Sequence, residues 1–149
     1  MNIRLAKIGP VAGALFLGTA LLSAPAHAQL RQIECAASGA GDISMSADYR
    51  ERFRNNQLRR RKFSVEFEAA PRGQFNLGDR LAVIVAGVRV ARPELRQDIN
   101  GDLFFDVNFD TFARQNDATA FPPNFPTIGQ RARVAIRKAG QLVLACMMR

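Results

Sequence analysis

The sequence predicts an all-β domain, a two-sheet antiparallel sandwich with immunoglobulin-like dimensions and about eight strands. Three observations indicate this fold. Apolar and polar residues alternate along short runs, the runs recur about every 10–15 residues, and turn-forming residues separate them. A small closed β-barrel is the alternative architecture, because its strands alternate in the same way.

A helical signal peptide, residues 1–28, is expected to precede this domain. Arg4 and Lys7 give it a positive start, Val11–Leu22 is apolar, and its last three residues are Ala-His-Ala. Signal peptidase requires small residues at such a site, so we expect cleavage after Ala28. The apolar run is shorter than the roughly 20 residues that span a bilayer, although an uncleaved anchor is the alternative. The prediction is a periplasmic or secreted protein with no transmembrane helix after cleavage.

Residues 29–149 then form a single domain, which is long enough to bury one core. Loss of Arg4 and Lys7 lowers the formal charge of the chain from +8 to +6. A basic surface favours anionic partners, such as lipid head groups, glycans or nucleic acid. The alternative is that the cations serve solubility and pair with the acids of the domain.

The composition limits the chemistry that the domain can perform. The only histidine, His27, lies in the predicted signal peptide. Without imidazole the domain has no Ser-His-Asp or Cys-His nucleophile and no histidine metal ligand. There is no tryptophan and one tyrosine, which weakens any carbohydrate-stacking surface. We expect no enzymatic activity and no cofactor.

Cys35 and Cys146 are the only cysteines. In an exported domain such a pair predicts a disulfide, here joining the first strand to the last. The chain-entropy model assigns about 4–5 kcal/mol of stability to a loop of this length. Two free redox-active thiols are the alternative, but the Cys-x-x-Cys spacing is absent.

The first strands are expected at Arg31–Ala37, Ile43–Arg54 and Arg59–Ala69. Asn55 and Asn56 mark a hairpin tip between the second and third, because asparagine tolerates left-handed backbone. Alternation within these runs directs one apolar set of side chains inward.

One strand is expected at Arg80–Val90, and its apolar run Leu81–Ala86 predicts a central strand covered on both faces, with Gly87 as a bulge or a close backbone approach. A short strand at Glu94–Ile99 follows. Asn100-Gly101 is a strong hairpin signal, and it leads into the alternating strand at Asp102–Thr111.

The region Phe112–Gly129 is predicted to be irregular, since its prolines exclude helix and central strand. A final hairpin is expected at Gln130–Lys138 and Gln141–Met148, with a turn at Ala139-Gly140. The predicted core residues are Ile33, Ile43, Met45, Phe63, Val65, Phe67, Val83, Val85, Leu103, Phe105, Val107, Phe109, Val134, Ile136, Leu142 and Leu144.

Asp98, Asn100 and Asp102 alternate as the oxygen ligands of an EF-hand calcium loop do. The pattern then fails, because Leu103 stands where that loop needs glycine and Phe109 where it needs a bidentate acid. We interpret the three residues as part of the hairpin turn and keep them as a secondary metal candidate.

Asp106, Asn108 and Asp110 share one face of a strand, where alternate residues lie about 6.5–7 Å apart. This spacing suits an inverting pair of carboxylates in a glycosidase, but no aromatic cleft accompanies it. We favour instead cross-strand pairing with Arg131, Arg133 and Arg137.

The most concentrated charge lies on both arms of the hairpin whose tip is Asn55-Asn56. Its members are Arg50, Arg52, Arg54, Arg59, Arg60, Arg61 and Lys62. Guanidinium groups bind phosphate in a bidentate manner, so this cluster is a candidate site for an anion or a partner. Nucleic acid is a less expected ligand, because the lone Phe53 offers little base stacking. The alternative is a solvated hairpin tip.

The segment Phe121–Pro126 holds Phe121 and Phe125 between prolines. It is either a lid over one end of the core or a rigid apolar contact for a protein partner. Taken together, the sequence predicts a non-enzymatic binding or structural module that contacts an anionic surface, a glycan or an envelope protein. An eight-stranded outer-membrane barrel is the alternative, and a carboxylate-based hydrolase is the third hypothesis.

Overall fold

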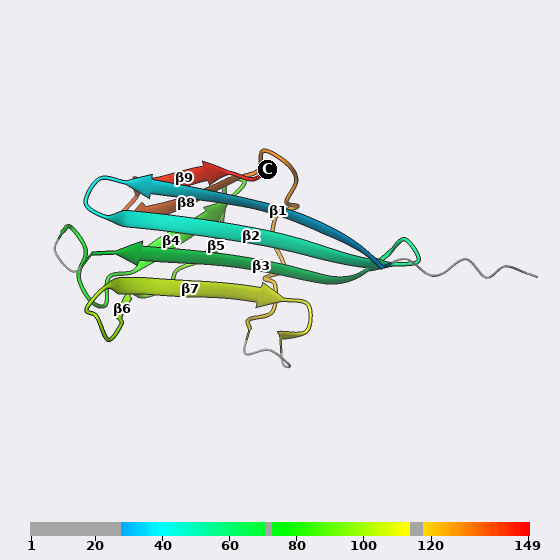
Figure 1. The fold of residues 1–149 in the computed structure, drawn as a ribbon, viewed down its shortest axis with the longest axis horizontal. Helices are drawn as coiled ribbons and strands as arrows, with labels where there is room; N and C mark the ends of the chain where they lie inside the picture. The colour runs from blue at the N-terminus through cyan, green and yellow to red at the C-terminus, as the bar shows by residue number, and fades with distance from the viewer. Residues whose placement is uncertain (1–27, 71–72, 114–117) are drawn as a thin grey trace, which may run out of the picture.

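The computed structural model describes residues 28–70, 73–113 and 118–149, which form two antiparallel sheets packed face to face (Figure 1). The five-stranded sheet has the order β1 (Ala28–Gly39), β2 (Ile43–Arg54), β3 (Gln57–Ala69), β7 (Leu103–Asp110) and β6 (Arg96–Gln97). The four-stranded sheet has the order β5 (Val88–Ala91), β4 (Leu81–Val85), β8 (Arg133–Lys138) and β9 (Gln141–Met147). Neither sheet closes on itself, so the predicted sandwich is confirmed and the closed barrel is not the fold.

The predicted signal peptide lies outside the described residues except for Ala28, which begins β1. In the described part of the chain, no helix has the length and apolar character needed to cross a membrane.

Strands β1, β2 and β3 form a meander because their turns are built from residues that accept left-handed backbone. Asn55 and Asn56 have φ angles of 52° and 58° at the predicted hairpin tip between β2 and β3. The Asn100-Gly101 turn between β6 and β7 is also as predicted, and Gly101 has a φ angle of 93°.

The prediction of one long strand over Arg80–Val90 is wrong. The chain turns at Ala86 and Gly87, whose φ angles are 46° and 86°, and β5 returns alongside β4. Gly87 is therefore a hairpin residue and not a bulge. Only Ala86 and Gly87 separate the apolar strand β4 from Val88, so the sequence lacks the polar break that would have marked the turn.

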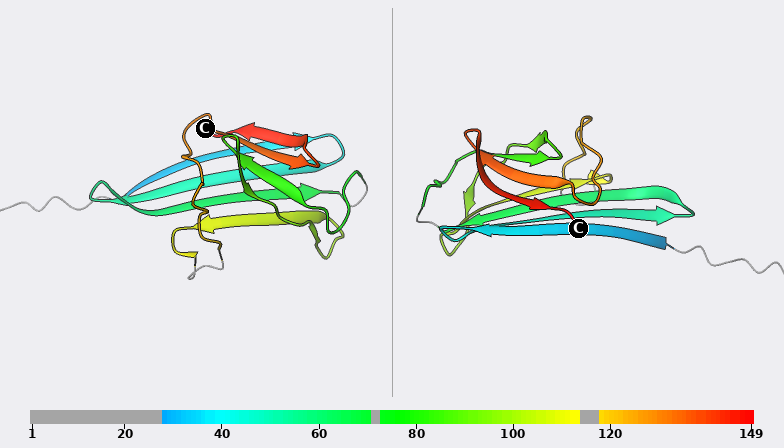
Figure 2. Two further views of the ribbon diagram at one scale, coloured as in Figure 1. Left: turned by 180° about the vertical axis from the view of Figure 1, so that it is seen from behind. Right: turned by 90° about the horizontal axis from the view of Figure 1, so that it is seen from above.

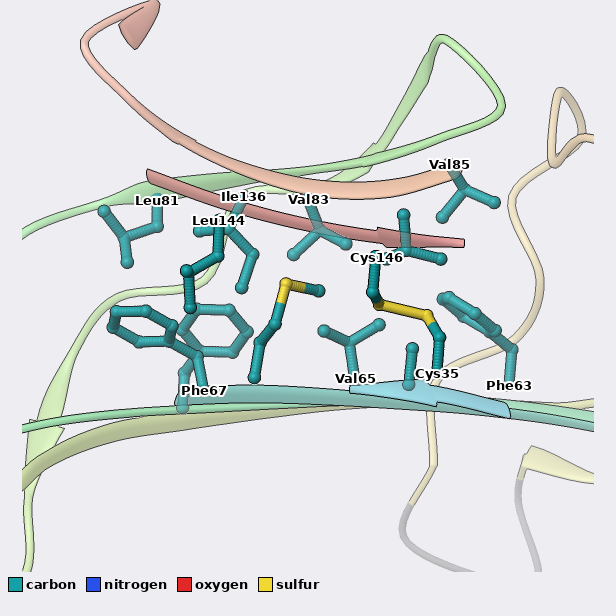
Figure 3. Packing of buried hydrophobic residues seen from close by; sticks show 14 of the residues in the cluster. Cys35, Phe63, Val65, Phe67, Leu81, Val83, Val85, Ile136, Leu144 and Cys146 are labelled. Carbon is teal, nitrogen blue, oxygen red and sulfur yellow. A yellow bond between two sulfur atoms is a disulfide. The ribbon is translucent and has the colours of Figure 1, made fainter. Parts of the chain in front are cut away.

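The core lies between the sheets and is joined across them by the Cys35–Cys146 disulfide, which links β1 to β9 as predicted (Figure 3). Most of the predicted core residues are buried. Two are not: Val107 is half-buried and Leu142 is 49% exposed. Leu142 turns outward because a register shift between Ile136 and Arg137 places it opposite Arg137.

The acids of β7 do not face the arginines of residues 131–137, which corrects a further prediction. Strand β7 pairs with β3 and β6, whereas β8 belongs to the other sheet. Asp106 instead lies 3.1 Å from Arg96, and Asp110 contacts cations of β3. A charge pattern alone does not reveal which of two sheets a strand joins.

The two sheets differ in length. Strands β1, β2 and β3 have 12, 12 and 13 residues, whereas β4 and β8 have 5 and 6. The long meander therefore extends past the four-stranded sheet and ends in a projecting hairpin (Figures 1 and 2). We call this projection the arm and define it as residues 28–32 of β1, 50–54 of β2 and 57–62 of β3, with the Asn55-Asn56 turn.

Candidate anion-binding arm

The arm carries all seven cations of the predicted cluster, and the strand register decides which of them share a face. Arg50 lies opposite Lys62, and Arg52 lies opposite Arg60. These pairs occupy the solvent side of the sheet, because Tyr49 and Phe63, the pair next to Arg50 and Lys62, point into the core. Like charges directly opposite each other on neighbouring strands are unfavourable. The arm therefore concentrates positive charge on one face at a cost in stability.

Arg54 continues the same face toward the tip, two residues beyond Arg52. Arg59 is the extra residue of a β-bulge, since the register shifts between Arg52 and Phe53 and leaves Arg59 without an opposite partner. Both side chains are exposed. The structure thus brings six of the seven predicted residues to the solvent face or to the bulge beside it, and turns Arg61 to the other face.

Asp110 anchors the base of the arm. The residue is 1% exposed, and its carboxylate accepts two hydrogen bonds from Arg60 Nε, at 3.0 and 3.2 Å, and a third from Arg60 Nη2. Lys62 Nζ lies 3.5 Å away, and the backbone N–H of Phe112 donates at 2.9 Å. The hydrogen bonds from Arg60 lower the pKa of Asp110 to about 2, although burial acts in the opposite direction. Asp110 is therefore charged at neutral pH and holds Arg60 in one orientation.

A second acid, Asp48, restrains Arg50. The Nε atom of Arg50 lies 2.7 Å from the carboxylate of Asp48, which stands two residues earlier on the same strand face. Four of the seven cations have no ion pair with an acid among the described residues: Arg52, Arg54, Arg59 and Arg61. On the solvent face, the uncompensated charge of Arg52, Arg54 and Arg59 therefore lies at the tip of the arm, and the compensated charge lies at its base.

Between these acids and cations the solvent face is hollowed into a pocket of about 210 Å³. Its polar lining comes from Asp48, Arg50, Lys62, Ser64, Asn108 and Asp110. The pocket adjoins the arm at its base, where the carboxylates of Asp48 and Asp110 lie beside Arg50 and Lys62.

Arg61 lies on the opposite face of the arm, where its guanidinium stands 4.8 Å from the ring centroid of Phe121. Phe121 and Phe125 are half-buried and contact each other with their ring centroids 4.7 Å apart. Phe125 also contacts Phe63 and Phe109, at 5.4 and 5.5 Å. The Phe121–Pro126 segment thus covers one end of the core, beside the arm. Its role as a contact for a protein partner stays a prediction.

The other residues considered from sequence have structural partners. Asp98 Oδ1 accepts hydrogen bonds from the backbone N–H groups of Asn100 and Asp102, at 2.8 and 2.9 Å, which is the role of an Asx turn. Among the described residues, no group of three or more His, Cys, Asp or Glu side chains is arranged to hold a metal ion. Asp106 is exposed and Asp110 is bound to Arg60, so the two carboxylates have different surroundings.

Sequence reasoning missed the anchoring role of Asp110. Strict alternation places Asp110 on the same strand face as Asp106 and Asn108, which are both exposed. Its burial depends on the last residues of β7 lying beside β3 and on the chain returning at Thr119, which exchanges backbone hydrogen bonds with Asn108 and Asp110. No local pattern in the sequence reports either contact.

The fold and the arm define a class of protein in general terms, a disulfide-linked β-sandwich with a cationic projection. Comparison of the chain with protein-family models, curated proteins and solved structures finds no match to any of them.

Proposed function

We propose that the protein is an exported, non-enzymatic module whose arm binds an anionic glycan that carries phosphate or sulfate groups. One observation carries this proposal. Arg52, Arg54 and Arg59 are exposed, close together and without an acidic partner among the described residues. Their mutual repulsion is relieved when an anion lies between them, and guanidinium groups bind such anions through paired N–H donors.

Export is supported by the pattern of residues 1–28 and by the disulfide, because disulfides persist mainly in oxidising compartments. An envelope or extracellular space also offers the ligand class, since anionic glycans occur at cell surfaces.

A non-enzymatic role is supported by the state of the carboxylates. A general acid near neutral pH needs a raised pKa, whereas the pKa of Asp110 is lowered to about 2 by Arg60. Asp110 positions a cation, and Asp106 is paired with Arg96 at the surface. Binding by the arm requires no proton transfer.

The experiment compares two triple variants that remove the same charge. The arm variant carries Arg52→Ser, Arg54→Ser and Arg59→Ser. The control variant carries Arg89→Ser, Arg133→Ser and Arg137→Ser. These three residues are exposed and belong to β5 and β8 of the four-stranded sheet. Each lost guanidinium contact to an anion should weaken binding by about tenfold, because a charge-assisted hydrogen bond contributes roughly 1.5 kcal/mol or more.

Affinity for a size-defined heparin fragment, a sulfated glycan, gives the readout at a fixed salt concentration. We expect the arm variant to bind far more weakly than the control variant, with circular dichroism spectra unchanged in both. Equal losses in the two variants would show that only net charge matters, and wild-type binding by the arm variant would rule out the arm as the site.

A further inference from the structure

The four-stranded sheet has a surface of unusual charge that no part of the proposed function uses. Its strands contain Arg89, Arg133, Arg137 and Lys138 but no aspartate or glutamate, whereas β1, β2, β3 and β7 of the other sheet all contain acids. Lys138 is engaged by Asp79 and by the carbonyl of Gln74. The three arginines are exposed. A surface of one sign therefore covers the outer side of this sheet.

Strand register places these arginines and several apolar residues on the same face. Ala82, Arg137 and Leu142 stand in one row across β4, β8 and β9. Ile84, Ala135 and Ala145 form the next row, and Arg89 extends it onto β5. Arg133 and Met147 are paired in a third row. We call this surface the four-stranded face.

Apolar side chains of the four-stranded face reach solvent. Leu142 is 49% exposed and Met147 is 51% exposed, each directly opposite an arginine of β8. Beside them a shallow groove of about 530 Å³ crosses the face. Its floor includes Ala82 and Ile84, and arginines 80, 89, 92 and 137 stand around it. An apolar floor with a guanidinium rim suits a ligand that has both an anionic group and hydrocarbon.

Few internal partners neutralise this rim. Arg80 lies 3.5 Å from Glu94, and Arg137 donates to the backbone carbonyl of Gly140 at 2.8 Å. Arg89, Arg92 and Arg133 have no ion pair with any acid in the described ranges. Their charge therefore acts on whatever approaches the sheet.

We propose that the four-stranded face binds the surface of a lipid bilayer that contains anionic head groups. Charge complementarity supports this occupant, because basic residues next to such a surface are attracted to it. The cations are spread over β5 and β8, and the exposed apolar residues lie on β9, so the contact is broad and suits a planar partner better than a single peptide. None of the four strands contains an aromatic residue, so the face offers no platform for stacking nucleic-acid bases.

This site is separate from the arm and faces the other way. Arg52, Arg54 and Arg59 lie on or beside the outer side of the five-stranded sheet, and the two outer sides of a sandwich point in opposite directions (Figure 2). A molecule resting on a bilayer through its four-stranded face therefore presents the solvent face of the arm away from that bilayer.

Vesicle sedimentation tests the proposal with the protein expressed from the full chain and purified as the cell processes it. The probes are vesicles of phosphatidylcholine alone and of phosphatidylcholine mixed with phosphatidylglycerol. The face variant carries Arg89→Ser, Arg133→Ser and Arg137→Ser, and the charge-matched control carries Arg52→Ser, Arg54→Ser and Arg59→Ser. Unchanged circular dichroism and an intact disulfide verify the fold of each.

We expect the wild type and the arm variant to sediment with anionic vesicles and not with neutral ones. The face variant should partition roughly 100-fold less, because each basic residue near an anionic surface contributes about fivefold. A Leu142→Ser, Met147→Ser variant should bind anionic vesicles at low salt and lose binding at high salt before the wild type does.

The proposal is overturned if the wild type ignores anionic vesicles, if the face variant binds like the wild type, or if both triple variants lose binding equally. The proposal is also overturned if duplex DNA binds the four-stranded face with higher affinity than anionic vesicles do. These outcomes are independent of heparin binding by the arm, so either site can fail alone.

Discussion

Arg60 and Asp110, fifty residues apart in sequence, form a bidentate ion pair at the base of the arm, with Arg60 Nε 3.0 Å from Asp110 Oδ1. The pair joins β3 to the end of β7 and fixes one guanidinium of the cationic face. Asp110 is buried, while the Arg60 side chain is 24% exposed. The contact therefore links the stability of the sandwich to the orientation of the arm.

Asp110→Asn should destabilise the fold by about 2 kcal/mol at pH 7, since the pKa of Asp110 falls from 3.8 to about 2 on folding. A lowered pKa stabilises the native state above pH 3.8, and this contribution is lost as the pH falls from 3.8 toward 2. Urea unfolding at several pH values measures it. The difference between wild type and variant should shrink below pH 3.8.

Asp106→Asn is the matched control for that variant. Its partner Arg96 is 61% exposed, and exposed ion pairs contribute little. A loss from Asp106→Asn as large as that from Asp110→Asn would contradict the anchoring role of Asp110.

Tyr49 should not ionise in the native protein until about pH 12. Burial raises the pKa of this phenol above its ordinary value of 10.0, and the hydrogen bond that it donates to Glu51 at 2.7 Å adds to the effect. The stability from the neutral phenol holds below pH 10 and is lost between pH 10 and 12. Because Tyr49 is the only tyrosine, ultraviolet titration reads it alone. Ionisation of the Tyr49 phenol near pH 10 in the folded protein would contradict its burial beside Glu51.

Replacing Cys35 and Cys146 by alanine should lower stability by about 4–5 kcal/mol, because the bond closes a loop with a sequence separation of 111. Urea unfolding with and without a thiol reductant provides the same comparison on the wild type. An unchanged unfolding midpoint after confirmed reduction would mean that core packing alone holds β1 against β9.

Phe125→Ala should cost about 2–3 kcal/mol, less than a fully buried phenylalanine, because the ring is half-buried against Phe63 and Phe109. Leu77→Ala at a 65% exposed position is the control and should change stability little. If Phe125→Ala changed stability as little as Leu77→Ala does, the segment would not act as a lid over the core. That result would favour the alternative, in which Phe121 and Phe125 contact a protein partner.

Much of the fold follows from local patterns in the sequence. Strict alternation located β2, β3 and β7, and the turn residues Asn55, Asn56 and Gly101 separated them from their neighbours. The β4–β5 hairpin was not predicted, because its turn, Ala86-Gly87, directly follows an apolar run. Alternation assigns a residue to a face of its own strand, but it does not say which strand lies alongside.

The same limit on prediction from local sequence patterns applies to the candidate sites. The cationic hairpin was predictable, since both of its strands carry the charge and their turn is short. The neutralisation of its base by Asp110 was not, because that contact depends on β7 joining β3. The four-stranded face was not predictable from the sequence either, since Arg89, Arg133 and Leu142 belong to three strands whose order only the tertiary structure reveals.

Amide NMR spectra recorded during titration with a heparin fragment test the central claim most directly, because they locate the ligand on the protein. We predict that the largest saturable shifts occur at residues 50–62, centred on Arg52, Arg54 and Arg59, and that high salt abolishes them. Shifts concentrated on the four-stranded sheet, or spread evenly over all surface arginines, would contradict a glycan-binding arm.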